Sequence, residues 1–316
     1  MHRVPDDLRH RPFARAEALA SGLPRGVLAG PQFRRVHHGV YRHRDLELGF
    51  DDRVAAARLA LPPGAVTTGL TRLQQLGIDR GPRAPLHFVL EGDHHLALDG
   101  VFLHRTVKMP PHDGDHATVE AAYVAYCADA RALEAVTMGC ELLRRRDLDV
   151  RLLEDLLAGE RWRRGVPETA YVLPMLDDRY RSVPEAELLA YVVASGLPVP
   201  DVNRTVALTD GTVLSPDQWF ETHGVAVEYE GSQHQEDRGQ YNADIDRYAA
   251  YRRNGVSYVQ VTKERMRSPR ATVRAVHRAL LAGGYEGQAP DFGVAWHALQ
   301  RPLRELVRHR PVPRGE

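Results

Sequence analysis

Three carboxylates stand close together in the sequence around one predicted strand. Within the run 225–230, Glu228 and Glu230 are two residues apart, so strand alternation places both side chains on one face. Asp217 follows Pro216 in the preceding predicted strand, and a short turn brings it beside Glu228. Carboxylates gathered on a central sheet repel one another and lose hydration unless a cation lies between them. The sequence therefore predicts a metal site formed by Asp217, Glu228 and Glu230, with Mg²⁺ as the ion and Mn²⁺ as a substitute.

A magnesium ion held in this way activates water and stabilises charge on a phosphodiester. The alternative is that the three acids form the solvated face of an amphipathic sheet, as most charged residues do. The segment that follows, Gly231-Ser232-Gln233-His234, favours a site. Its glycine allows a ligand to approach the backbone closely, and His234 can accept a proton near neutral pH. We expect His234 to position or deprotonate the attacking water.

Three more polar residues flank this group. Asp244 and Arg247 stand at i and i+3 on one face of a predicted helix, where they either orient the site or form an ordinary intrahelical ion pair. Glu185 is the fourth residue of a capping box that begins at Ser182. It either caps that helix or contributes to the metal site, and both interpretations stay open.

Caps, turns and alternation define the elements that must position these residues. They are a helix from Ser182 to Ser195, two strands joined through Asp210-Gly211, a third strand at 225–230, a helix at 238–253, a fourth strand near 257–262 and a helix from Ser268 to about Gly283. The order α-β-β-β-α-β-α predicts an α/β core with a mixed sheet flanked by helices.

The N-terminal segment has a different pattern. A short amphipathic helix precedes Gly22, a helical turn follows at 25–29, and two β-prone runs flank the turn at Gly39. This order is typical of a winged-helix unit, although a small helical cap without a DNA role fits it equally. Residues 1–44 carry nine arginines against three acids. We expect these arginines to share one face, and the ones predicted to contact nucleic acid are Arg25, Arg34, Arg35 and Arg42.

The composition limits the classes of protein to which this chain can belong. The 316 residues are 43% apolar, enough for two or three globular units, and 42 basic residues balance 42 acidic ones. No apolar run reaches the roughly 18 residues of a membrane span, and the charged N-terminus is unlike a signal peptide, so we expect a cytoplasmic protein without a membrane partner. Cys127 and Cys140 stand thirteen apart in predicted helices, which favours buried thiols over a disulfide or zinc site.

The predicted organisation has four parts. A winged-helix-like unit occupies 1–48, a middle α+β region 49–181, the α/β core 182–284 and a C-terminal extension 285–316. Within the middle region, strands are expected around 86–107 and two or three helices at 117–158. The tail after Val307 is expected to fray.

The C-terminal residues resemble the PD-(D/E)XK nuclease superfamily, in the branch similar to very-short-patch-repair endonucleases and their actinobacterial relatives. The resemblance covers roughly the last 130 residues. It is carried by Ser-x-x-Glu at 182–185, Gly-Leu-Pro at 196–198, Asp217, Glu-Tyr-Glu-Gly at 228–231, His234, Asp-x-x-Arg at 244–247 and Gly255. Glu230 stands where those relatives have aspartate, and the superfamily's usual lysine is absent there, while Lys263 ends the fourth strand. The resemblance implies a restriction-endonuclease-like fold.

The N-terminal half resembles the winged-helix domain of type IV abortive-infection antitoxins, through Arg34-Arg35-Val36 and Gly39-Val40-Tyr41-Arg42. Two function classes follow. One is a magnesium-dependent DNA endonuclease in defence or repair, whose N-terminal unit binds duplex DNA while the C-terminal unit cuts. The other is a non-catalytic DNA-binding regulator of antitoxin type, with a toxin as a further partner. The zero net charge also leaves a protein-interaction module open.

Overall fold

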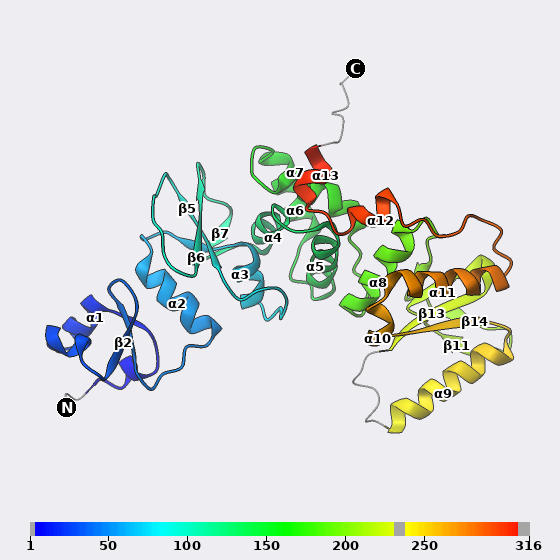
Figure 1. Ribbon diagram of the computed structural model, residues 1–316, viewed down its shortest axis with the longest axis horizontal. Coiled ribbons are helices and arrows are strands. Elements are labelled where there is room, and N and C mark those ends of the chain that lie inside the picture. The colour runs from blue at the N-terminus through cyan, green and yellow to red at the C-terminus, as the bar shows by residue number, and fades with distance from the viewer. Residues whose placement is uncertain (1–3, 231–237, 309–316) are drawn as a thin grey trace, which may run out of the picture. The chain divides into compact units, whose positions relative to one another are not determined.

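The protein is described by a computed structural model that covers residues 4–230 and 238–308, without the side chains of residues 238–245. It folds as two compact units, Met1–Tyr126 and Cys127–Glu316. Within the described residues there are thirteen α-helices and four sheets, two of which are mixed, so the chain is α/β with mixed sheets (Figure 1). None of these helices has the length and apolar character that crossing a membrane requires.

The first unit opens with a small three-stranded antiparallel sheet. Its elements are η1 (Asp7–Arg9), β1 (Phe13–Ala14), α1 (Arg15–Ala20), the 3-10 helix η2 (Arg25–Ala29), β2 (Phe33–His37) and β3 (Val40–His43). The strand order is β1-β3-β2. Phe13 and Phe33 meet edge to face at 5.6 Å in the core, and Gly39 takes the positive φ of 74° that the hairpin turn requires. The predicted hairpin is therefore present, and the predicted second helical turn is a 3-10 helix.

A mixed five-stranded sheet completes the first unit. Its strands are β4 (Val66–Thr67), β5 (Leu86–Glu91), β6 (Val101–Thr106), β7 (His112–Asp113) and β8 (His116–Ala117), and its helices are α2 (Phe50–Ala60), α3 (Gly69–Gln75) and α4 (Val119–Cys127). The order is β6-β5-β4-β8-β7, with β5 and β6 parallel. Phe88 and Val54 lie in its core.

The second unit begins with helices that lead into the α/β core. They are α5 (Ala132–Arg144), α6 (Val150–Gly159), α7 (Val166–Val172), η3 (Leu173–Met175) and α8 (Val183–Ala194). Helix α5 packs on α8, and Leu133 of α5 belongs to the same apolar core as Leu188 of α8. This unit therefore includes helices upstream of residue 182. Cys127 and Cys140 are buried, as predicted, and burial raises the pKa of Cys140 to about 11.

The core sheet of the second unit has the order β14-β13-β12-β9. Its strands and those of a side hairpin are β9 (Asp201–Val202), β10 (Val206–Ala207), β11 (Val213–Leu214), β12 (Gln218–Phe220), β13 (Val225–Glu230) and β14 (Ser257–Thr262), with η4 (Glu221–His223) between β12 and β13. Each of the two strands predicted around Asp210-Gly211 is broken in two. Asn203 leaves the extended conformation at φ 48°, and Pro216 offers no backbone N–H, so β10 and β11 pair separately as a hairpin.

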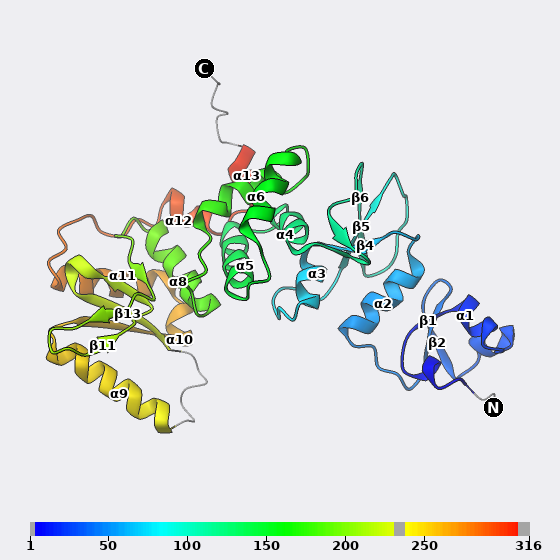
Figure 2. The same ribbon diagram turned by 180° about the vertical axis from the view of Figure 1, so that it is seen from behind.

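Helices cover both faces of this sheet (Figures 1 and 2). The remaining elements are α9 (Arg238–Arg253), α10 (Lys263–Met266), α11 (Pro269–Ala282), α12 (Val294–Ala298) and α13 (Leu303–Arg308). Helices α8 and α11 lie on one face and α9 on the other. On the α11 face, Val225 and Val227 of β13 pack with Val276. On the α9 face, Trp219 and Ala226 pack with Tyr251. This alternation places every second residue of β12 and β13 toward α9.

Candidate carboxylate site

Asp217 and Glu228 are brought together by the pairing of β12 with β13. Gln218 pairs with Val227 and Trp219 with Ala226, so the same register places Asp217 opposite Glu228 on the α9 face. The backbone N–H of Tyr229 donates a hydrogen bond of 2.7 Å to Oδ2 of Asp217. Both carboxylates are buried, with 8% and 5% of their surface exposed. The strand register therefore places these two acids side by side, as predicted.

Burial raises the pKa of Asp217 to about 7, and the nearby charges of Glu185 and Glu228 add to this shift. The Tyr229 amide and the charge of Arg181 lower it only in part. Asp217 is thus a carboxyl group whose ionised form is disfavoured by its surroundings. A cation beside it would reverse that preference.

Glu228 has partners on α9. The Tyr251 hydroxyl donates to Oε1 at 2.6 Å, and Nη1 of Arg247 lies 3.2 and 3.3 Å from the two carboxylate oxygens. Burial raises the pKa of Glu228, while these two donors oppose the shift. Arg247 was predicted to act near the site, and Tyr251 was missed. Its position one helical turn after Arg247 was the available signal, because residues four apart share a helix face.

Glu230 lies at the end of β13, where it pairs with Thr262 of β14 and accepts a hydrogen bond from Nε2 of Gln260. Among the described residues no group of three or more histidine, cysteine, aspartate or glutamate side chains is arranged to hold a metal ion. His234 lies outside the described residues, as does the side chain of Asp244. In the described part of the site, the carboxylates that come together as a strand pair are therefore Asp217 and Glu228.

Glu185 caps α8 and also contributes charge to the site. Its Oε1 accepts a hydrogen bond from the Ser182 hydroxyl at 2.8 Å, and its Oε2 accepts one from the Arg181 backbone N–H at 3.0 Å. It is 6% exposed, and its charge raises the pKa of Asp217. Glu185 therefore caps the helix, as one of the two interpretations predicted, and its part in a metal site stays a prediction.

Asn203 connects Glu185 to the strand that carries Asp217. Its side-chain amide donates to Oε2 of Glu185 at 3.1 Å, and its backbone N–H donates to the carbonyl of Asp217 at 3.1 Å. Asn203 takes a left-handed conformation, which asparagine adopts more readily than most residues. Sequence reasoning missed it because a strand was predicted through this position.

The donor set of Asp217 and Glu228 fits magnesium. Proteins commonly bind this ion through one or two carboxylates and leave its other positions to water and substrate phosphates. Asp217 and Glu228 are two such carboxyl groups on neighbouring strands, and the third predicted ligand, Glu230, stands two residues beyond Glu228 on the same strand.

The arginines of the first unit are arranged differently from the expectation. Arg34 pairs directly with Arg42 across β2 and β3, whereas Arg35 pairs with Tyr41. Because consecutive strand residues point to opposite faces, Arg34 and Arg35 do not share one face, and that expectation was wrong for this pair. Arg25 of η2 is exposed, and so are Arg34 and Arg35 of β2.

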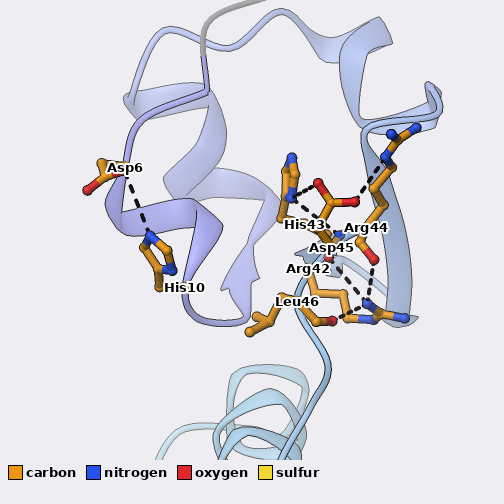
Figure 3. A network of polar contacts seen from close by, with 7 residues as sticks. All are labelled: Asp6, His10, Arg42, His43, Arg44, Asp45 and Leu46. Carbon is orange, nitrogen blue, oxygen red and sulfur yellow. Dashed lines mark hydrogen bonds and ion pairs between the residues drawn. The ribbon is translucent and has the colours of Figure 1, made fainter.

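Arg42 donates hydrogen bonds to backbone carbonyls of its own hairpin exit (Figure 3). Its Nη1 donates to the carbonyls of His43 at 3.3 Å and Arg44 at 3.1 Å, and to that of Leu46. These bonds hold the segment that leaves β3, which gives Arg42 a structural role apart from any phosphate contact. In the same segment, Asp45 lies 3.6 Å from the His43 ring and 3.2 Å from Nε of Arg44.

Comparisons with known proteins give two distant relatives. The chain is 25% identical over 257 residues to the uncharacterized proteins MT2308 and Rv2248 of two strains of Mycobacterium tuberculosis, which covers 79% of this chain and 94% of each relative. No family model matches the chain. These similarities extend over most of the sequence, and the relatives' names carry no activity.

Proposed function

We propose that this protein is a metal-dependent DNA endonuclease that hydrolyses phosphodiester bonds, in defence or repair. The observation that carries the proposal is the burial of Asp217 and Glu228 opposite each other on neighbouring strands. Two buried acids that repel each other oppose folding, and binding a cation removes that penalty. The order α8, β9, β12, β13, α9, β14 and α11 supports a restriction-endonuclease-like core.

In this proposal Asp217 and Glu228 hold Mg²⁺ or Mn²⁺, and Glu230 completes the ligand set. The chemistry that such an ion would supply there is a lower pKa for a water molecule and stabilisation of negative charge on the phosphate. His234 positions that water or accepts its proton. Glu185, Asp244 and Arg247 orient these groups, and for Arg247 the contact with Glu228 supports this role.

The first unit is proposed to bind duplex DNA as a winged helix. Arg25, Arg34 and Arg35 are exposed and would contact phosphates, and the hairpin of β2 and β3 would act as the wing. Arg42 would contribute to binding through its remaining donors while Nη1 holds the hairpin exit.

A second candidate is a non-catalytic DNA-binding regulator of antitoxin type, paired with a toxin. One observation favours it. Arg247 and Tyr251 already bind the Glu228 carboxylate, so Arg247 supplies a positive charge that a metal would otherwise provide, and the Tyr251 hydroxyl adds a hydrogen bond. In that case the nuclease-like fold would act as a scaffold.

Plasmid DNA incubated with the protein separates the two candidates. An endonuclease converts supercoiled DNA to nicked or linear forms in Mg²⁺ or Mn²⁺, and EDTA abolishes the reaction. A regulator binds the same DNA and leaves it intact under all three conditions.

A further inference from the structure

Helices α10 and α11 carry a row of positive charge that lies far in sequence from the N-terminal arginines. From Lys263 to Ala282 the sequence has six basic residues and the single acid Glu264. Arg267, Arg270, Arg274 and Arg278 are all exposed. The last three stand four residues apart, so they form one row along α11 with about 6 Å of helix rise between neighbours. We call Arg270, Arg274 and Arg278 the α11 arginine row.

This row has no acidic partners among the described residues. None of its three arginines makes an ion pair there, whereas other arginines of the same unit are paired, as Arg144 is with Glu141 and Arg301 with Glu305. Like charges four residues apart on a helix repel each other. Arg270 also stands in the first turn of α11, where the helix dipole disfavours a cation. The row therefore carries a charge repulsion that an anionic partner would relieve.

Packing holds two of the three side chains in place. The guanidinium groups of Arg270 and Arg274 lie 5.6 and 5.2 Å from the centre of the Phe292 ring. Phe292 in turn contacts the buried Trp296 edge to face at 4.8 Å. A cation that is held before binding loses less conformational freedom when it meets its partner.

The row begins at the end of the sheet where β13 and β14 end. Thr262 pairs with Glu230 across the parallel strands β13 and β14, and Thr262 is the N-cap of α10. Asp217 bonds the amide of Tyr229, the residue before Glu230. Both helices therefore start at the end of the sheet toward which Glu228 and Glu230 lie, and α11 runs from there along the face opposite to the one that carries Asp217 and Glu228 (Figure 1).

We propose that the α11 arginine row binds the phosphate backbone of a nucleic acid, whose strand then passes around the end of the sheet toward the Asp217 and Glu228 pair on the opposite face. Arginine forks match phosphate oxygens with two parallel hydrogen bonds, and a strand offers repeated phosphates to a repeated row. A membrane-bound helix would present apolar residues beside its cations, but Val273, Val276 and Leu280 of α11 are buried in the core. This inference rests on the proposed function for its direction toward the site, and the binding itself is independent of cleavage.

The test is DNA binding in EDTA, where no cleavage occurs. The row variant carries three substitutions, Arg270→Gln, Arg274→Gln and Arg278→Gln. The control variant loses the same charge at three other exposed arginines of the same unit, by Arg151→Gln, Arg161→Gln and Arg308→Gln. Fluorescence anisotropy with a labelled duplex oligonucleotide is measured over a range of salt concentrations. The row variant should bind roughly tenfold or more weakly, and its salt slope should fall by about 1 for each lost phosphate contact. The control should keep wild-type binding.

A lysine variant at the same three positions should restore the binding only in part, because the charge is retained while the guanidinium fork is lost. Equal binding by the row variant, the control and the wild type would overturn the proposal. It would equally be overturned if the row variant lost binding only to phosphatidylserine vesicles or to polyglutamate and kept its affinity for DNA. Plasmid cleavage in Mg²⁺ or Mn²⁺ is measured separately. If the protein binds DNA through the row but does not cut it, the proposed endonuclease activity is refuted and the binding role of the row is kept.

Discussion

The Tyr251 hydroxyl on α9 donates a hydrogen bond of 2.6 Å to Oε1 of Glu228 on β13. This bond joins the helix on one face of the sheet to a carboxylate that is 5% exposed. The same carboxylate is bound by Arg247 one helical turn earlier. The geometry of Glu228 is therefore set by two side chains of one helix.

We expect Tyr251→Phe to destabilise the second unit. The substitution leaves a buried carboxylate with one donor fewer, which costs about 1 to 3 kcal/mol. Urea denaturation followed by circular dichroism measures the change. Tyr258→Phe is the matched control, since Tyr258 is half-buried and stacks on Tyr248 at 4.7 Å, and it should shift stability by less than about 0.5 kcal/mol. Equal losses from both variants would contradict a role for the hydroxyl.

The stability of the second unit should fall as pH rises from about 4 to about 7. Over this range the folded protein keeps a proton on Asp217, whose pKa is raised to about 7, while the unfolded chain has released it. The raised pKa of Glu228 acts in the same direction. Asp217→Asn removes the charge, so at a pH of about 8 this variant should be more stable than the wild type by roughly 2 to 4 kcal/mol, with little difference near pH 4.

Denaturation of the wild type and the variant at several pH values checks this prediction. Glu221→Gln is the control, because Glu221 is exposed and should leave the pH profile unchanged. A wild-type profile that is flat between these pH values would contradict the assignment of a raised pKa to Asp217.

Magnesium or manganese should oppose the same destabilisation. A cation that binds only the folded state raises its stability in proportion to the logarithm of the ion concentration, once the site is nearly saturated. We expect the melting temperature of the wild type to rise on addition of either ion at a pH of about 8, and to return with EDTA. Asp217→Asn should show no such rise, while Glu221→Gln should behave as wild type. Ion-independent melting of all three proteins would refute the metal site.

The arginines of the first unit should separate into two roles. Arg34→Gln with Arg35→Gln should weaken DNA binding and lower its salt slope by up to about 2, because both residues are exposed. Arg42→Gln should instead lower the melting temperature, since Nη1 of Arg42 binds three backbone carbonyls. Anisotropy and thermal denaturation on the same variants distinguish these effects. Unchanged stability in Arg42→Gln would contradict its structural role.

Local patterns predicted much of the second unit. Strand alternation in 225–230 and the short turn before it were enough to place Asp217 opposite Glu228. The capping box predicted the start of α8 at Ser182. The predicted length of the two strands around Asp210-Gly211 was wrong, because Asn203 and Pro216 interrupt them.

Long-range partners were harder to predict. Tyr251 reaches Glu228 and Asn203 reaches Glu185 only after the helices have packed on the sheet, and no local pattern encodes those distances. The arginine row of α11 was visible in the sequence, but its significance depended on knowing that the opposite face of the helix is buried. In the first unit, the alternation of β2 could have shown in advance that Arg34 and Arg35 point apart.

The central claim is that Asp217 and Glu228 form the metal site of an endonuclease, and plasmid cleavage tests it most directly. Wild type, Asp217→Asn, Glu228→Gln and the control Glu221→Gln are incubated with supercoiled plasmid in Mg²⁺, in Mn²⁺ and in EDTA. The account predicts metal-dependent cutting by the wild type and by Glu221→Gln, and its loss in the two site variants with DNA binding retained, because each substitution deletes an inner ligand. Equal cutting by the wild type and Asp217→Asn, or no cutting by a wild type that binds DNA, would contradict it.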